Sequence, residues 1–160
     1  MNNMKRYLLS ALTVLCFLIA FAQENTKVYY IDGLYYADKE QKSIYTGDYK
    51  EYYPDGTLKM EIFISKGKPE GTYVIYFPSG KTQEIRSYKN GRFHGMWRTY
   101  SESGIILSQA EYSDDKKDGE WIIRNEEGVK LYEMHYEKGK RVGVWKMWDE
   151  DGHLLSEKEY

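Results

Sequence analysis

The residues best suited to metal chemistry are three histidines. His94, His135 and His153 fall at three different positions of a pattern that repeats along the chain, and the one cysteine, Cys16, is distant from all of them. A metal site needs several ligands that converge on one point, and this spacing brings none together. The sequence therefore predicts no metal site and no cofactor.

Carboxylates recur regularly enough to suggest acid–base chemistry, because glycoside hydrolysis uses two acids placed in a cleft. The residues concerned are Glu61, Glu111, Glu133, Glu157 and Glu159. By alternation they share one face of a predicted strand, and a regular open sheet provides no cleft, so a solvated face explains them. No glycine-rich loop precedes a helix, as a phosphate loop would require. We expect no catalytic residues and a protein that is not an enzyme.

A repeat of 24 residues must position these side chains. Its marker, position 0 of each unit, is a glycine: Gly47, Gly71, Gly95, Gly119 and Gly143. Position 2 is always aromatic: Tyr49, Tyr73, Trp97, Trp121 and Trp145. Position 9 is a second glycine, and position 17 reads Ile64, Tyr88, Tyr112, Tyr136 and Tyr160. Four positions that recur with the same period of 24 residues indicate a repeat protein.

Each unit has the composition of a β-hairpin. Two runs rich in Tyr, Trp, Ile and Val flank a turn dipeptide that ends in glycine, and glycine supplies the positive φ that tight turns require. A second set of turns leads into the next unit: Lys66-Gly67, Asn90-Gly91, Asp114-Asp115 and Lys138-Gly139. No segment keeps an apolar period near 3.6 residues, so no helix is expected.

A single hairpin cannot bury its apolar face, so the units are expected to pair side by side. The predicted fold is all-β, an elongated single-layer meander of tandem β-hairpin repeats. Equivalent residues then recur about every 10 Å, since neighbouring strands lie about 4.8 Å apart. The predicted organisation is a signal peptide at 1–22, an N-terminal capping hairpin and loop at 23–46, and five repeats at 47–160.

The first residues have the features of an export signal. Lys5 and Arg6 precede an apolar run over residues 7–22, which is shorter than the roughly 20 residues of a membrane span. An Ala-x-Ala sequence ends at Ala22, so cleavage is predicted after that residue. An uncleaved N-terminal anchor is the alternative.

One aromatic row is a candidate binding surface. Position 2 is expected to pack between neighbouring hairpins, whereas position 5 points to the opposite face of the same strand. The position 5 row consists of Tyr52, Tyr76, Tyr100 and Trp148. On a single-layer sheet it has nothing to pack against and would form an exposed strip suited to protein or sugar contact. In a strongly twisted sheet both rows would instead be structural.

A basic row is a second candidate, for binding anions. Position 21 carries Lys68, Arg92, Lys116 and Lys140. At a spacing of about 10 Å these side chains would form a cationic stripe along one edge of turns, suited to lipid headgroups or an anionic polymer. Solubility and protection of the sheet edge are an equally simple explanation.

These repeats resemble the bacterial MORN-repeat-variant family (MORN_2 type). Its units run glycine, x, aromatic, x, x, Tyr, Tyr, x, x, Gly and end in Asn-Gly-Lys-x-x-Gly; the sequences GTYVIYFPSG at 71–80 and NGRFHG at 90–95 match closely, and the resemblance extends over 45–160. It implies a sheet of hairpins without catalytic residues and a role in protein or lipid contact. Many such chains are labelled antitoxins of the YwqK family of toxin–antitoxin systems, although a cytoplasmic antitoxin should not carry an export signal.

The sequence thus predicts an exported, non-enzymatic protein-binding or scaffold module in the cell envelope, located in the periplasm, at the outer envelope or secreted. The expected partner is another protein. Binding of an envelope glycan or of an anionic lipid or polymer is one alternative, and an antitoxin-like partnership with a toxin is another. The 23 basic and 25 acidic residues nearly cancel, so no nucleic acid is expected. An exposed strand edge could support a homo-oligomer.

Overall fold

The computed structural model describes residues 27–160, and the predicted signal peptide and cleavage site lie outside this range. The described chain contains strands and turns. The strands are β1 (Tyr29–Ile31), β2 (Leu34–Tyr36), β3 (Gly47–Tyr52), β4 (Leu58–Ser65), β5 (Lys68–Tyr76), β6 (Thr82–Lys89), β7 (Arg92–Tyr100), β8 (Ile106–Ser113), β9 (Lys116–Lys117), β10 (Gly119–Arg124), β11 (Lys130–Glu137), β12 (Lys140–Trp148) and β13 (Leu154–Glu159).

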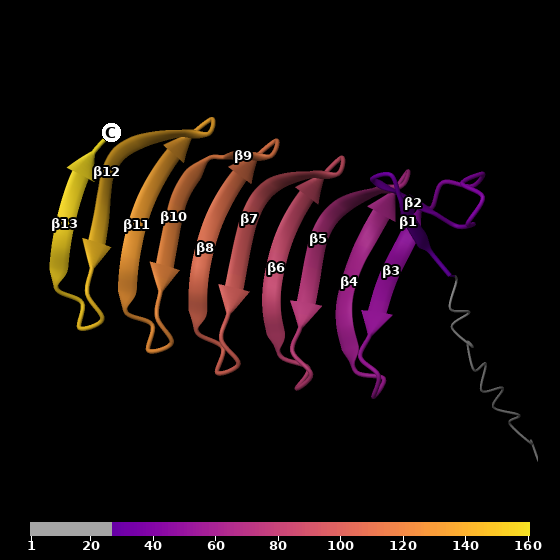
Figure 1. Cartoon of the computed structure of the whole chain (residues 1–160), viewed down its shortest axis with the longest axis horizontal. Helices are drawn as coiled ribbons and strands as arrows, with labels where there is room; N and C mark the ends of the chain where they lie inside the picture. Colours follow the sequence, from indigo (N-terminus) through magenta and orange to yellow (C-terminus); the bar gives the residue numbers. More distant parts are fainter. Residues whose placement is uncertain (1–26) are drawn as a thin grey trace, which may run out of the picture.

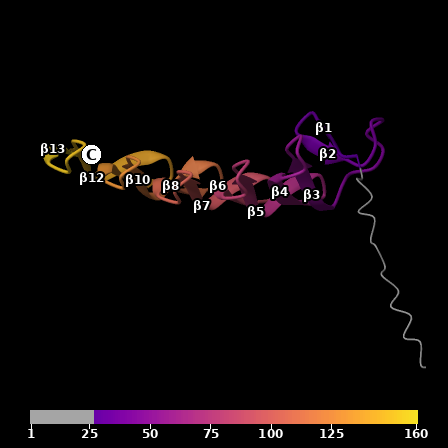
Figure 2. The same ribbon diagram turned by 90° about the horizontal axis from the view of Figure 1, so that it is seen from below.

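Strands β3 to β13 form one antiparallel sheet whose strand order follows the chain (Figure 1). The short β9 continues the chain beyond β8 and pairs with it. Seen from the side, the sheet is a single open layer, with the β1–β2 hairpin raised above one end (Figure 2). The predicted all-β meander of hairpins is confirmed. Within residues 27–160, no helix is long and apolar enough to cross a membrane.

The turns between repeats have positive φ at both central residues. The values are 53° and 80° at Asn90 and Gly91, and 48° and 66° at Asp114 and Asp115. Positive φ at both positions defines the type I′ turn, whose twist matches that of the flanking strands. Asp115 takes this conformation without being glycine, and its Oδ1 accepts a hydrogen bond of 2.8 Å from the Phe93 amide of the preceding repeat.

The glycine at position 0 lies at a β-bulge. Between β4 and β5 the register shifts where Ile62 faces residues 71–73, and Gly71 has φ of 77°. Similar shifts occur between β6 and β7 and between β11 and β12. A bulge leaves backbone groups unpaired and increases the local twist, and positive φ favours glycine. The recurring glycine therefore reflects a backbone requirement.

The β1–β2 hairpin packs on one face of the sheet at its N-terminal end (Figure 2). The ring centroids of Tyr35 in β2 and Tyr49 in β3 are 5.5 Å apart. The Tyr35 amide donates a 2.9 Å hydrogen bond to the carbonyl of Gly67, in the first turn between repeats. The hairpin is thereby fixed to the first two units.

Beneath this hairpin lies the hydrophobic core cluster of the described chain. Met60, Ile62 and Ile64 of β4 are 7%, 5% and 0% exposed. Partly buried residues pack around them: Tyr35, Tyr45, Tyr49, Tyr73, Ile75 and Tyr88. The sheet is therefore enclosed at its N-terminal end, whereas the later repeats have only their neighbours to pack against.

Replacing Ile64 by Ala should lower the free energy of unfolding by about 2–5 kcal/mol, because the change leaves a cavity at a fully enclosed site. Urea unfolding followed by circular dichroism measures the loss. Leu155→Ala is the matched control, since Leu155 is 58% exposed and an exposed substitution should cost less than about 0.5 kcal/mol. Equal effects of the two changes would show that the N-terminal end is not enclosed.

Candidate functional site

Alternation divides the side chains of the sheet between two faces. We call the face that carries positions 2 and 17 of the repeat the ladder face, and the face that carries positions 5, 14 and 16 the acidic face. The β1–β2 hairpin covers the start of the ladder face through the contact of Tyr35 with Tyr49. Over β7 to β13, no described segment covers it (Figures 1 and 2).

Aromatic rings on the ladder face touch one another from repeat to repeat. The ring centroids of Tyr112 and Trp121 are 5.1 Å apart, those of Trp121 and Tyr136 5.3 Å, and those of Tyr136 and Trp145 5.2 Å. Tilted and edge-on pairs of this kind are favoured by the ring quadrupoles. We call the connected set the aromatic ladder: Tyr73, Tyr88, Phe93, Trp97, Tyr112, Trp121, Tyr136, Trp145 and Tyr160.

Hydrogen bonds fix two of the indole rings. Trp121 Nε1 donates to the Glu111 carbonyl and Trp145 Nε1 to the His135 carbonyl, both at 3.1 Å. His135 adjoins a register shift between β11 and β12, and a bulge leaves carbonyls free to accept such bonds. The ladder rings are half-buried, apart from the exposed Tyr160. They form a rigid surface with one side open to solvent.

Cations lie over rings of the ladder, with 4.2 to 5.3 Å between the charged group and the ring centroid. Arg86 lies over Tyr73 and Trp97, Lys117 over Trp121 and Tyr136, and Arg141 over Trp145 and Tyr160. A cation over a ring face is attracted by the ring quadrupole. Burial acts to lower the pKa of Arg86, but hydrogen bonds to Glu84 and Tyr88 prevail and raise it.

The two faces differ in charge. Among residues 92–160, the strand positions on the ladder face include Lys117, Arg141 and Lys158 but no Asp or Glu. The carboxylates of these strands alternate to the other face: Glu111, Glu120, Glu133, Glu137, Glu157 and Glu159. The uncovered part of the ladder face is therefore aromatic and cationic.

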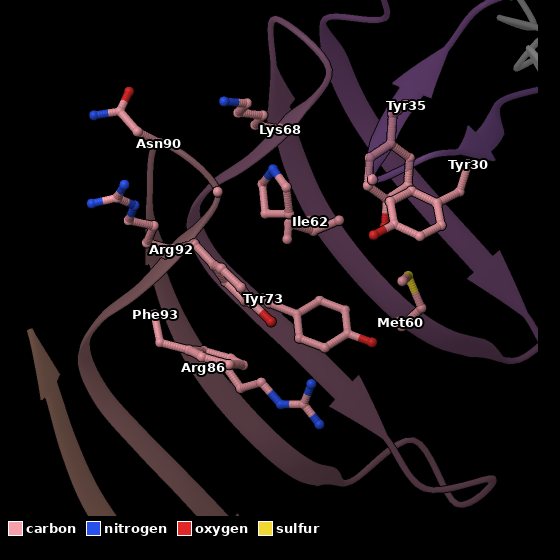
Figure 3. A pocket seen from close by; sticks show the side chains of 14 residues that line it. Tyr30, Tyr35, Met60, Ile62, Lys68, Tyr73, Arg86, Asn90, Arg92 and Phe93 are labelled. Carbon is pink, nitrogen blue, oxygen red and sulfur yellow. The ribbon is translucent and has the colours of Figure 1, made fainter. Parts of the chain in front are cut away.

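A groove of about 530 Å³ lies where the β1–β2 hairpin overhangs the ladder face (Figure 3). It is lined by Tyr30, Gly33, Tyr35, Met60, Ile62, Lys68, Pro69, Tyr73, Arg86, Tyr88, Asn90, Gly91, Arg92 and Phe93. Burial raises the pKa of Tyr73, and that of Tyr35 to about 12.

The predicted position 5 row lies on the acidic face and is partly engaged in internal contacts. The Tyr76 hydroxyl donates a 2.6 Å hydrogen bond to Glu61, which raises the pKa of Tyr76 to about 12 and lowers that of Glu61. Trp148 has the Lys130 ammonium 5.4 Å from its ring centroid. Tyr52 is exposed and Tyr100 half-buried. That this row binds a partner stays a prediction.

The predicted basic row lies along one edge of turns, because Lys68, Arg92, Lys116 and Lys140 begin β5, β7, β9 and β12. All four are exposed. The structure divides them, however, since Lys68 and Arg92 line the groove and Lys116 and Lys140 do not. Anion binding by the whole row stays a prediction.

Two sets of possible metal ligands lie close together in the structure. The spacing of these residues in the sequence did not predict either set. Glu120, Glu133 and His135 approach one another within 4.8 Å, as do Asp149, Asp151 and His153. The register between β10 and β11 creates the first set, and such a register cannot be read from spacing alone. In that set, Lys130 Nζ binds Glu133 at 2.6 Å.

The second set belongs to a turn. Asp149 Oδ1 accepts the backbone amides of Asp151 and His153 at 3.0 and 2.8 Å. These hydrogen bonds lower the pKa of Asp149. Because one carboxylate in each set, Glu133 in the first and Asp149 in the second, already has internal partners, we assign no metal to either.

Sequence reasoning treated position 2 as structural and did not combine it with other columns. In the structure, positions 2, 17 and 22 share one face, where position 22 contributes Phe93, Lys117 and Arg141. The alternation of side chains between the two faces could have predicted that positions 2 and 22, both even-numbered, lie on the same face. Placing position 17 beside them also required the antiparallel register across each turn.

Comparison with known proteins gives a family. Residues 45–65, 69–90, 93–114 and 141–160 match the MORN repeat variant family (MORN_2). The predicted fourth repeat, which carries Arg124-Asn125 where two aromatics are usual, is not matched, yet it forms β10 and β11 of the same sheet. No curated protein matches the chain.

Among solved structures, the chain is similar to one from the crystal structure of accessory secretory protein 1, 2 and 3 in Streptococcus pneumoniae. The TM-score is 0.36 and the sequence identity 17%, over 80% of this chain and 22% of that chain. This chain thus spans about a fifth of the solved chain's length. The four repeat matches cover more than half of the sequence, so this protein belongs to the MORN repeat variant family.

Proposed function

We propose that the protein is an exported, non-enzymatic binding module that docks another protein on its ladder face. The observation that carries the proposal is the aromatic ladder over β7 to β13, a run of half-buried rings that no described segment covers. Ordered aromatic rings offer large contact areas at low entropic cost, and the centres of protein interfaces are enriched in Tyr, Trp and Arg.

Membership of the MORN repeat variant family also supports a binding function, since MORN repeats are used for binding. The geometry favours the ladder face over the position 5 row because its rings form one connected surface. Exposed apolar side chains extend that surface: Ile123 and Tyr132 are 38% and 39% exposed and pair across β10 and β11. A partner would therefore gain a broad apolar contact with cations at intervals.

The cations within the ladder favour a second candidate, a partner that is an envelope glycan or an anionic lipid or polymer. Lys117, Arg141 and Lys158 face the same side without a carboxylate among them. Binding driven by these charges would weaken steeply with salt, whereas aromatic contact would not. A toxin would be a special case of a protein partner, and a second copy could pair with the outer edge of β13, which is the last strand of the sheet.

Export predicts a defined mature N-terminus. Expressed in a bacterium with a general secretory pathway, the protein should leave the cytoplasm and begin at Gln23, as measured by fractionation and intact mass. Replacing Ala22 by a bulky residue, as in Ala22→Tyr, should block cleavage because the peptidase pocket accepts only small side chains there. A cytoplasmic protein that retains Met1 would contradict export.

Docking on the ladder face predicts that Ile123→Asp combined with Tyr132→Asp abolishes retention of the partner from native envelope extract. Placing charge in an apolar interface should weaken binding by at least tenfold, or about 1.4 kcal/mol. These residues are exposed on the ladder face, so the variant should keep its circular dichroism spectrum. Crosslinking and mass spectrometry identify the partner, and its affinity is then measured with purified components.

The matched control replaces Tyr52, Tyr76, Tyr100 and Trp148 of the acidic face by Ala, which should leave retention intact. Loss of the partner in this variant alone would assign binding to the acidic face. Retention of the same salt-labile glycan or lipid by every variant would favour the second candidate.

A further inference from the structure

In the groove beneath the β1–β2 hairpin, two residues of the predicted basic row meet a concave surface. Its volume of about 530 Å³ is within the usual range of ligand sites, roughly 300–1,000 Å³. Lys68 and Arg92 lie on one side, and Tyr30 and Tyr35 on the other (Figure 3). Ile62 lies between them, Met60 lies below Tyr30 in this view, and Tyr73 lies below Ile62; these three side chains form a largely apolar floor (Figure 3).

The charge at the rim of the groove is only partly compensated. Three cations and no carboxylate line it. Arg86 is paired with Glu84, but Lys68 makes no salt bridge within the described chain, and the contact of Arg92 with Asp115 is long, at 3.9 Å, with both side chains more than half exposed. The rim is therefore complementary to an anionic group.

The Lys68 side chain packs against the next turn. A Cβ added to Gly91 would lie 3.2 to 3.4 Å from three carbons of the Lys68 side chain, so its methylene stem packs against the backbone of that turn. Lys116 and Lys140 begin their strands at the same position of the repeat but have no overhanging hairpin. Lys68 and Arg92 therefore lie at a concave site, whereas Lys116 and Lys140 do not.

The groove is continuous with the aromatic ladder, because Tyr73, Tyr88 and Phe93 belong to both. A protein docked on the ladder would therefore lie next to the groove. A segment of that same protein is the occupant that the position of the groove favours.

We propose that this groove binds an extended acidic segment of a partner protein, with its carboxylates at Lys68 and Arg92 and an aromatic or aliphatic side chain on the floor of Met60, Ile62 and Tyr73. This inference rests on the proposed function, because it gives the docked protein a second contact beside the ladder. The acidic segment and the surface that meets the ladder would belong to the same partner.

The test is a selection of random peptides displayed on phage against the purified protein, followed by fluorescence anisotropy with the enriched peptides. These should carry Asp or Glu next to an aromatic or aliphatic residue. The double variant Lys68→Glu with Arg92→Glu should bind them about tenfold more weakly. The matched control, Lys116→Glu with Lys140→Glu, makes the same change in net charge outside the groove and should bind normally. Circular dichroism verifies the fold of both variants.

Enrichment of basic or neutral peptides, no enrichment, or equal loss in both double variants would overturn the inference. The protein is also tested against polygalacturonate and phosphatidylglycerol vesicles, and binding of either that depends on Lys68 and Arg92, without peptide binding, would reject a polypeptide ligand. If Ile123→Asp with Tyr132→Asp abolishes partner retention while Lys68→Glu with Arg92→Glu does not, the proposed function stands and this inference alone fails.

Discussion

The contact on which the sheet depends is the one between aromatic rings of successive repeats. A single-layer sheet has no opposing layer to bury its apolar residues, so each hairpin can be stabilised only by its neighbours. The pair of Tyr112 with Trp121, and that of Tyr136 with Trp145, supply this contact at centroid distances of 5.1 and 5.2 Å. At the preceding junction Phe93 links Tyr88 to Trp97, and at the first junction the buried Ile64 takes the place of a ring, so beyond the N-terminal cluster the protein is stabilised along its length.

Backbone geometry keeps these rings in line. The indole N–H groups of Trp121 and Trp145 donate to backbone carbonyls near the bulge at position 0, and type I′ turns return the chain with the twist of the sheet. An insertion within a repeat would move its rings to another place or to the other face. The constant period of 24 residues therefore has a physical cause, the alignment of rings over five repeats. The same alignment leaves the rings of Trp121, Tyr136 and Trp145 only half-buried.

The fold could be predicted because its signals are local. Turn glycines, strand composition and the period sufficed for an all-β meander, and the predicted fourth repeat forms its strands despite Arg124-Asn125. The candidate site could not be predicted in full, because it depends on contacts between segments. Alternation placed Tyr52 and Tyr73 on opposite faces, but the pairing of position 17 with position 2, the cation Arg86 between two rings, and the groove under the hairpin all require register and tertiary packing.

The central claim is that the ladder over β7 to β13 faces solvent in the free protein and is covered in a complex. Hydroxyl-radical footprinting read by mass spectrometry tests this directly, because oxidation of Trp and Tyr follows the exposure of their rings. The account predicts oxidation of Trp121, Tyr136 and Trp145 in the free protein, little oxidation of Met60 beneath the β1–β2 hairpin, and protection of the three rings when the partner is bound. Rings as protected as Met60 in the free protein, or rings that stay reactive in the complex, would contradict it.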